Sequence, residues 1–558
     1  MKRDAILASY SGASFSGQMQ VKRGKFITPI RSGDVIAMFS PPQPAATSPV
    51  ASCLSGNHRS FSTLLVGVIL LLACALSAPL IAASARPNIL VILTDDQGST
   101  TLSCYGNKLV ATPHLDRLAA EGARFTDAYV MPQCTPTRAA LLTGQSTARN
   151  RMWHVIPWYG YPRARLREPL FRDQLSRDTF TLGQGLQAAG YVTGTAGKWH
   201  LTTNADGNYS ALKPEAARYY GFDFSAPPGP GSQNEGDKWV DHLTDQTVAF
   251  IEKNRARPWF FYLAHHTLHG KLSAPPPLVA KYLGRGAPAA GLHNATYLAA
   301  IEHLDTSVGR LMAKLDELGQ RENTLVVFLS DNGGIDTQFN PAPFLESAGA
   351  AHAPSTPTQL TVLDRAFSNA PLRMGKGSHY EGGIRVPCLV RWPGVVRPGT
   401  VNDTPIHVVD WLPTFFAAAG ATAPAAHPLD GQNLGPLLRG EPLPLRALYW
   451  YLPLYEVRWA GTPCAIIREG DWKLIEFFGD WFDPAGRYTP GHRLELYDLR
   501  RDLGEQHDLA ATEPARAKSL QAKLRAWLAA TPAEVPGPNP AFDPTHPLLE
   551  SRQKPTAP

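Results

Sequence analysis

Apolar runs and amphipathic stretches alternate along the first two thirds of the chain that follows residue 85. Asn88–Thr94 (NILVILT) is a continuous apolar run, rich in β-branched residues and too short for a helix, so it predicts a buried parallel strand. Residues 112–125 (TPHLDRLAAEGARF) place Leu115, Leu118 and Ala119 at helical spacing. The chain therefore begins its ordered part with a strand followed by a helix.

The alternation recurs further along the chain. Residues 181–201 (TLGQGLQAAGYVTGTAGKWHL) read as a helix followed by a strand. In residues 297–334, an apolar stripe of helical period precedes the strand-like run TLVVFLS. The stripe consists of Ile301, Leu304, Val308, Leu311, Leu315 and Leu318. This order predicts an α/β fold with a large, mainly parallel mixed sheet flanked by helices.

The pattern changes near residue 441. Short strand-like runs (ALYWYL, CAIIREGDWKLIEFF, LELYDL) precede a last helix near 516–530, which predicts a smaller α+β domain with an antiparallel sheet over 441–535. The larger domain then covers 86–440. The proline-rich tail, 536–558, is expected to be poorly ordered. Residues 335–370 lack periodicity and predict a long loop.

Composition and charge narrow the class of protein. With 558 residues, 44% apolar and 18% charged, the chain can bury a large core. The formal net charge of +6 could indicate a nucleic-acid partner, but seven Lys/Arg and only two Asp/Glu precede Arg86. The remainder of the chain is nearly neutral. We therefore expect no nucleic-acid partner.

Residues 1–85 have the features of a leader. Arg59 precedes the apolar stretch LLVGVILLLACAL, and Ala83-Ser84-Ala85 is an A-x-A cleavage signal. The pattern favours a cleaved signal peptide and a secreted or periplasmic protein over a lipoprotein modified at Cys74. Contact with a membrane is expected only if the leader stays uncleaved. Met38 is a second candidate for the start of translation.

Cysteines are few. Two of the six lie in the leader, and the other four are Cys104, Cys134, Cys388 and Cys464. No C-x-x-C motif for zinc is present. Buried free thiols are favoured over one disulfide among Cys104, Cys388 and Cys464.

Two acidic pairs directly follow strand-like runs. Asp95 and Asp96 come after the first predicted strand, and Asp331 and Asn332 come after another. Because ligands collect at the carboxyl ends of strands in open α/β sheets, the two pairs can meet at one point. Three carboxylates and an amide oxygen suit Ca²⁺ or Mg²⁺. Either pair alone would be read as a turn or a helix cap.

Cys134 precedes a helix-like run in the segment VMPQCTPTRAALLTGQ. Pro136 suits the first turn of a helix, so Cys134 is expected at the helix N-terminus, where free N–H groups favour anions. Arg138, four residues later, falls on the same helical face. From the residues alone, Cys134 is either an activated thiolate or an ordinary core residue.

The segment CTPTRAALLTG, residues 134–144, resembles the signature of the type I, formylglycine-dependent sulfatases of the alkaline phosphatase superfamily. GYVTGTAGKWHL is similar to the second signature of that family. RPNILVILTDDQG, LSDNGG, NAPLRMGKGSHYEGGIRVP and LYDLRRDLGEQHDLA also resemble sulfatase segments and follow in family order. The resemblance covers about residues 86–509 and includes arylsulfatase-like members. Gln133, just before the cysteine, is a minor departure.

The resemblance implies a set of site residues. Those implied to hold Ca²⁺ or Mg²⁺ are Asp95, Asp96, Asp331, Asn332 and an oxygen of modified Cys134. Those implied to be catalytic are Cys134, Arg138, Lys198, His200, His269, Lys376 and Asp331. His269 is selected over His265 and His266 because FFYLAHHTLHGKL aligns with a P-H-x-P-like turn of the family, although Leu268 and Lys271 replace its prolines.

The resemblance also implies the chemistry. A formylglycine-generating enzyme would oxidise Cys134 to formylglycine, whose hydrate attacks the sulfur of a sulfate ester with Asp331 as the proton acceptor. His269, with Lys376, would protonate the departing alcohol. His200 would then deprotonate the second hydroxyl, which expels sulfate and restores the aldehyde.

The substrate is less sharply defined. A sulfated small molecule or oligosaccharide is expected, with a carbohydrate favoured because sugar faces can stack on Trp450, Tyr451, Tyr455, Trp459 or Trp481. The alternative is that these aromatic residues pack the small sheet. Rival functions are a phosphate or phosphonate monoester hydrolase of the same superfamily and a catalytically inactive, secreted sugar-binding protein. A papain-like cysteine hydrolase is disfavoured because it leaves the acidic pairs without a role.

Overall fold

The computed structural model describes residues 86–157, 160–336, 368–483 and 487–544, which all belong to one compact unit. The predicted leader lies outside the described residues, as does most of the predicted loop at 335–370. Within the described part, no helix is both long and apolar enough to cross a bilayer.

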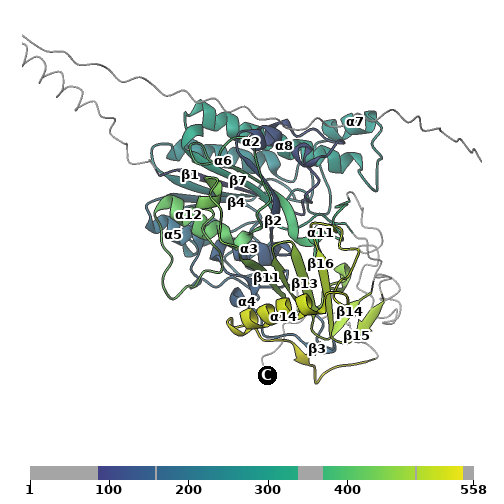
Figure 1. Cartoon of the computed structure of the whole chain (residues 1–558). Coiled ribbons are helices and arrows are strands. Elements are labelled where there is room, and N and C mark those ends of the chain that lie inside the picture. Colours follow the sequence, from purple (N-terminus) through teal and green to yellow (C-terminus); the bar gives the residue numbers. More distant parts are fainter. Residues whose placement is uncertain (1–85, 158–159, 337–367, 484–486, 545–558) are drawn as a thin grey trace, which may run out of the picture. The chain divides into compact units, whose positions relative to one another are not determined.

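A nine-stranded sheet forms the centre of the unit (Figure 1). Its order is β10-β2-β8-β7-β1-β6-β4-β5, and β9 pairs with β2. The strands are β1 (Asn88–Thr94), β2 (Ala123–Tyr129), β4 (Val192–Gly197), β5 (Phe224–Ser225), β6 (Trp259–Ala264), β7 (Thr324–Ser330), β8 (Arg385–Arg391), β9 (Thr400–Asn402) and β10 (Ile406–His407). Strand β8 runs antiparallel to β2 and β7, and the other pairings are parallel. The predicted mixed, mainly parallel sheet is confirmed.

Helices cover both faces of this sheet. Leu90 and Ile92 of β1 face a core built with α2, α6 and α8, whereas Ile89, Val91 and Leu93 face a core built with α3, α5 and α12. Burial of alternate side chains on both faces explains why β1 is apolar throughout. The helices are α2 (Pro113–Ala120), α3 (Cys134–Thr143), α4 (Thr147–Asn150), α5 (Leu182–Ala188), α6 (Val240–Asn254), α7 (Pro276–Gly284), α8 (Ala295–Glu317), α11 (Glu381–Ile384), α12 (Trp411–Ala419), α13 (Gly435–Leu438) and α14 (Pro514–Ala529). Short 3₁₀ turns are η1 (Ser103–Tyr105), η2 (Pro214–Tyr220), η3 (Arg321–Asn323), η4 (Val408–Asp410) and η5 (Val457–Trp459).

The C-terminal part forms a second, antiparallel sheet. It consists of β11 (Ala447–Leu452), β12 (Cys464–Glu469), β13 (Trp472–Phe477) and β16 (Arg493–Asp498). A separate hairpin pairs β14 (Asp480–Phe482) with β15 (Tyr488–Pro490). Helix α14 packs on the four-stranded sheet, where Trp527 stacks on Tyr449 with ring centroids 4.7 Å apart. One apolar core includes residues of both sheets, and the domain boundary near residue 441 stays a prediction.

The first part of the proline-rich tail contacts a distant segment of the chain. Strand β17 (Gly537–Pro538) pairs with β3 (Leu166–Arg167). The Asn539 side chain donates hydrogen bonds to the carbonyl oxygens of Pro162 and Ala164, at 2.9 and 2.7 Å. These long-range bonds fix residues 537–539, which local composition could not foresee.

Three of the aromatic residues considered for sugar stacking belong to the core instead. Trp450, Tyr451 and Tyr455 have no exposed surface. The Trp450 indole N–H donates to the carbonyl oxygen of Val130, and the Tyr455 hydroxyl bonds Asp480. Packing of the small sheet therefore explains these three. All four cysteines of the described part are free thiols, as favoured from sequence.

Candidate active site

The two acidic pairs meet at the carboxyl ends of neighbouring strands. Strands β1 and β7 pair in parallel with Thr94 opposite Ser330, so the residues that follow emerge side by side. The Asp96 N–H donates to Asp331 Oδ1 at 3.2 Å, and Asn332 Nδ2 donates to Asp96 Oδ1 at 2.7 Å. The structure thus brings together the residues that were predicted to hold a cation.

The oxygens of this cluster fit a hard divalent cation. Asp95 Oδ1 and Asn332 Oδ1 are buried and have no hydrogen-bond partner among the described residues. The Cys134 Sγ atom, one carboxylate oxygen of Asp95 and one of Asp331 all lie within 4.8 Å of one another. Because a buried polar oxygen without a partner is costly, this set of atoms fits the ligand sphere of a hard divalent cation such as Ca²⁺ or Mg²⁺.

Cys134 is the first residue of α3, and its thiol faces the acidic cluster. Its Sγ lies 3.6 Å from His200 Nδ1. Burial raises the pKa of the thiol above its usual value, although Lys198 and Lys376 oppose the shift. The thiol is therefore neutral near pH 7, which argues against an activated thiolate. The preceding Gln133 is buried too, and its side chain donates to Glu456 Oε2 at 2.8 Å.

Arg138 lies one turn after Cys134 and is fully buried. Its Nε and Nη2 donate to Asp331 Oδ2 at 3.1 and 2.6 Å. Its Nη1 donates to the carbonyl oxygen of Lys198 at 3.0 Å. Arg138 therefore links the start of α3 to the ends of β7 and β4, as a rigid planar cation can.

Two lysines neutralise the other two carboxylates. Lys198, directly after β4, lies 2.5 Å from Asp95, and Lys376 lies 2.7 Å from Asp96. Burial disfavours the charged lysines, but the nearby carboxylates outweigh it and raise the pKa of Lys198 and of Lys376. Burial likewise opposes ionisation of Asp95, but Lys198 and neighbouring cations hold its pKa well below the usual range.

The other two carboxyls are harder to ionise. Burial raises the pKa of Asp331 to about 7, with a further contribution from the Asp95 charge, although Arg138 opposes it. Burial also raises the pKa of Asp96, which Lys376 opposes and Asp95 reinforces. Crowded carboxyls that resist ionisation together are typical of sites that bind a cation.

His200 is held as a neutral base that faces Cys134. Its Nε2 lies 2.7 Å from the carbonyl oxygen of Ile156, which can only accept, so the proton belongs on Nε2 and the Nδ1 lone pair faces Sγ. Burial, with the charge of Lys198, lowers the pKa of His200 well below its usual value. Its φ of 51° is left-handed, a strained conformation typical of functional positions.

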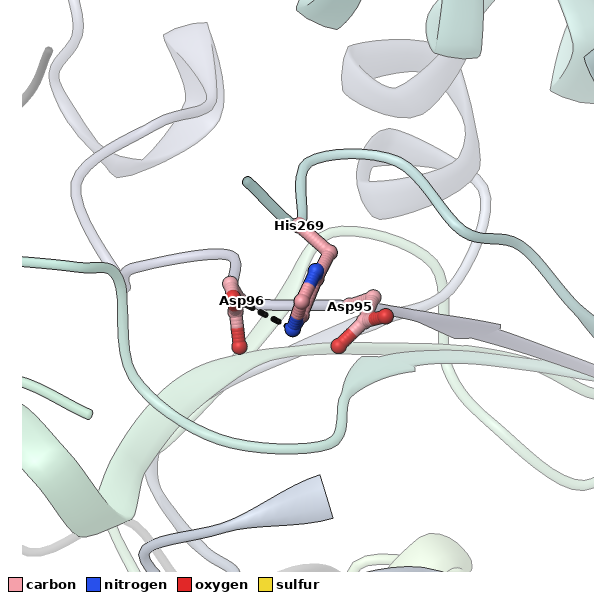
Figure 2. Close-up of side chains that lie close together, drawn as sticks. All are labelled: Asp95, Asp96 and His269. Atoms are coloured by element: carbon pink, nitrogen blue, oxygen red, sulfur yellow. Dashed lines mark ion pairs between the residues drawn. The ribbon is translucent and has the colours of Figure 1, made fainter. Parts of the chain in front are cut away.

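His269 lies beside Asp95 and Asp96 of the acidic cluster (Figure 2). Its Nε2 is 3.8 Å from Asp96 Oδ2, and 26% of its side chain is exposed. Burial, reinforced by Lys376, lowers its pKa well below the usual range. His265 instead contacts the Ser307 hydroxyl at 3.4 Å, away from the carboxylates. His266 is buried between Trp239 and Tyr209.

Sequence reasoning missed Tyr209, whose ring contacts several of these residues. No motif marks it, because it lies in a loop whose path depends on the tertiary structure. Trp459 is another aromatic residue close to the predicted site residues. Its ring packs directly on Gly377, next to Lys376, where a Cβ would overlap it.

Comparison with known proteins identifies the family. A family model described as Sulfatase matches residues 87–421, more than half of the chain, and one described as N-sulphoglucosamine sulphohydrolase, C-terminal, matches residues 374–533. The chain belongs to the sulfatase family. This sulfatase is 33% identical to human arylsulfatase A over 78% of its own length and 86% of that protein. It is 30% identical to a sulfatase of Formosa agariphila, over 80% and 89% of the two chains.

Solved structures agree with this assignment. The sulfatase is similar to the crystal structure of Ps i-CgsB, with a TM-score of 0.63 and 26% identity, over 82% of this chain and 94% of the other. The complex of that protein with k-i-k-neocarrahexaose gives a TM-score of 0.62. Two phosphonate monoester hydrolases, at TM-scores of 0.54 and 0.55 and at most 22% identity, share the fold alone. The recognition of the family from sequence is confirmed.

Proposed function

We propose that this sulfatase hydrolyses sulfate monoesters of ring-bearing alcohols, with carbohydrates as the favoured class, through an aldehyde made from Cys134 and a divalent cation. The observation that carries the proposal is the convergence of the Cys134 thiol with Asp95 and Asp331, within 4.8 Å, beside buried oxygens that lack partners. A neutral, buried thiol at this place is a poor nucleophile. Oxidation of Cys134 to formylglycine would supply a hydroxyl nucleophile in its place.

The residues of the site can be given roles from their geometry. When bound, Ca²⁺ or Mg²⁺ would withdraw charge from the sulfuryl oxygens and from the nucleophile. Lys198 and Lys376 would bind the remaining oxygens as protonated donors. Arg138 fixes the carboxylate of Asp331, which has an oxygen within 4.8 Å of Cys134 Sγ, and we assign to it the proton that residue 134 gives up.

The two histidines divide proton transfer between the two ends of the reaction. His200 directs an unprotonated Nδ1 at residue 134, so it suits the base that removes a proton from the second hydroxyl there. His269 is partly exposed, on the side where an alcohol can leave, so it suits the acid that protonates the alcohol. A bound anion favours the charged imidazolium that this role needs. The net reaction consumes one water and yields the alcohol and sulfate.

The preference for a carbohydrate rests on the edge of the site. Trp459 is partly exposed and packs on Gly377, beside Lys376, so its ring can meet a sugar face. Trp481 is covered by Arg493, whose guanidinium lies 4.0 Å from the ring centroid, and it is a weaker candidate. Relatives include proteins called steryl-sulfatase as well as a structure with a bound oligosaccharide, so a ring-bearing alcohol is the common element.

We also propose that the protein is exported, because residues 64–76 are apolar and an A-x-A site ends at Ala85. The proposal predicts a secreted or periplasmic chain that begins at Arg86. The proposed aldehyde nucleophile also requires a formylglycine-generating enzyme, which would oxidise Cys134 before the chain folds.

Replacement of Cys134 tests the function. The wild-type protein should hydrolyse nitrophenyl sulfate faster than nitrophenyl phosphate, whereas Cys134→Ala should lose activity by roughly three orders of magnitude or more and keep its melting temperature. Cys388→Ala is the matched control, since Cys388 is a buried free thiol in β8, and it should keep turnover. Faster hydrolysis of the phosphate would favour a phosphate or phosphonate monoester hydrolase. No hydrolysis of either ester would favour an inactive sugar-binding protein.

Mass spectrometry tests the modification and the leader in one preparation. The tryptic peptide from Phe125 to Arg138 should carry an aldehyde in place of the Cys134 thiol. The intact mass should correspond to a chain that starts at Arg86. An unmodified thiol in a fully active sample would contradict the proposed nucleophile, and a retained leader would contradict cleavage.

A further inference from the structure

Tyr209 occupies a fixed position at the edge of the site. It lies in a short turn closed by a bridge between Gly207 and Leu212. The N–H of His200 donates to the carbonyl oxygen of Asn208 at 3.1 Å, and the Asn208 side chain accepts from the N–H of Ser210 at 2.8 Å. The backbone of His200, a predicted catalytic residue, thus holds the turn that carries Tyr209.

The ring of Tyr209 contacts the residues that handle protons and charge. Its centroid lies 4.7 Å from that of His200 and 5.6 Å from that of His269. The Lys198 ammonium lies 4.6 Å from the ring centroid, within the range of a cation–π contact.

Exposure distinguishes Tyr209 from most of the site. Cys134, Arg138 and Lys198 are at most 1% exposed, whereas Tyr209 is partly exposed and 26% of the His269 side chain reaches solvent. A bound sulfate group must lie inward, near the buried cations and Cys134. The alcohol part of the ester must then extend outward past His269, and Tyr209 borders that path.

We propose that Tyr209 contacts the alcohol portion of the ester and selects alcohols whose oxygen is carried on a ring. The inference rests on the proposed function and adds a specificity-determining residue to it. A flat ring packed against another gains roughly 0.5–1.5 kcal/mol over an aliphatic contact, which corresponds to about 2- to 12-fold in affinity. The competing explanation is that Tyr209 only shields Lys198 and His200 from water.

Kinetics of variants separate the two explanations. Tyr209→Leu should raise KM for nitrophenyl sulfate about fivefold to tenfold and leave the inhibition constant of inorganic sulfate within about twofold. Tyr209→Phe keeps the ring and should change neither value beyond about twofold. Tyr219→Leu is the matched control, because Tyr219 packs under Arg177 and away from the site histidines, and it should resemble the wild type.

Two results would overturn the proposal. One is an unchanged KM in Tyr209→Leu. The other is a parallel rise of KM and of the sulfate inhibition constant, since a residue that only shields the buried cations would weaken both.

A binding comparison keeps the proposal testable if Tyr209→Leu does not fold or if the wild type shows no turnover. Calorimetry on the wild-type protein compares benzenesulfonate with methanesulfonate, which carry the same charged group. If Tyr209 contacts the ring of a bound ester, benzenesulfonate should bind at least about fivefold more tightly than methanesulfonate. Equal binding of the two would contradict the proposal. Absence of turnover with nitrophenyl sulfate, in contrast, contradicts the proposed function and leaves this comparison intact.

Discussion

Charges in the site are matched one to one. The pairs are Lys198 with Asp95, Lys376 with Asp96, and Arg138 with Asp331. Even with all three carboxyls ionised, the three cations leave no net negative charge, so a divalent cation would make the cluster positive and suited to an anionic ester. Electrostatic balance of this kind makes the affinity for a cation and the affinity for the substrate depend on one another.

Removal of the cation is the clearest test at the residue scale. After treatment with EDTA, addition of Ca²⁺ or Mg²⁺ should raise the melting temperature by a few degrees, because an ion that binds only the folded state adds about 2.7 kcal/mol at a concentration one hundred times Kd. Asp95→Asn should lose this shift. Asp245→Asn is the control, because its exposed carboxylate pairs with Arg310 and belongs to none of the groups in the described residues that could hold a metal ion. An equal shift in Asp95→Asn would contradict the assigned ligands.

At the scale of elements, the site depends on the close approach of two loops. Gly333 directly follows the Asp331-Asn332 pair, and its N–H donates to the carbonyl oxygen of Gly383 at 3.0 Å. A Cβ on Gly333 would overlap the carbonyl oxygen of Gly382, in α11. The loop after β7 therefore packs, with no room for a side chain, against α11 at the end of the segment that carries Lys376.

Substitution of this glycine should damage stability and activity together. Gly333→Ala is expected to lower the free energy of unfolding by about 1–3 kcal/mol, since overpacking forces the backbone apart, and to reduce kcat because Asn332 and Lys376 move. Thermal unfolding and nitrophenyl sulfate hydrolysis would measure both effects. Gly284→Ala, at the end of α7 with open space around its Cα, should be neutral or slightly stabilising. A Gly333→Ala protein with wild-type stability would show that the two loops can separate freely.

At the scale of the whole described unit, a buried charge cluster links the two sheets. Lys473 of β13 lies 3.0 Å from Glu381 of α11 and 2.8 Å from Glu505, and all three side chains are fully buried. Burial raises the pKa of Glu505 to about 7, which Lys473 opposes and the Glu381 charge reinforces. Burial also opposes ionisation of Glu381, but Lys473, Arg385 and Arg468 together outweigh it and lower the pKa of Glu381 to about 2.

This arrangement predicts a specific pH dependence of stability. Because the pKa of Glu505 is higher in the folded state than in the unfolded chain, the folded state binds the extra proton, and stability falls as pH rises from about 4.5 to about 7. Glu505→Gln mimics the protonated form. The variant should match the wild type near pH 4 and be more stable by up to about 3 kcal/mol above pH 8. Melting temperatures across this range would measure the difference. Glu513→Gln, at an exposed position, should follow the wild type at every pH, and a Glu505→Gln protein that is less stable above pH 8 would reverse the assignment.

Local patterns of the sequence determined the elements and the family. The apolar run of β1, the helical stripe of α8 and the strand β7 appear in the structure where periodicity placed them, because such segments must be buried on both faces or on one. Position after a strand also sufficed to foresee that Asp95 and Asp331 meet, since parallel neighbours end at the same edge.

Tertiary structure decided what depends on contacts between distant segments. Only the fold shows that Tyr209 borders the site, that Trp450 is core whereas Trp459 packs on Gly377, and that β17 pairs with β3. Periodicity reports which face of an element is buried, but it carries no information about which other segment covers that face. Burial likewise sets the neutral state of the Cys134 thiol, and burial is a property of the packed chain.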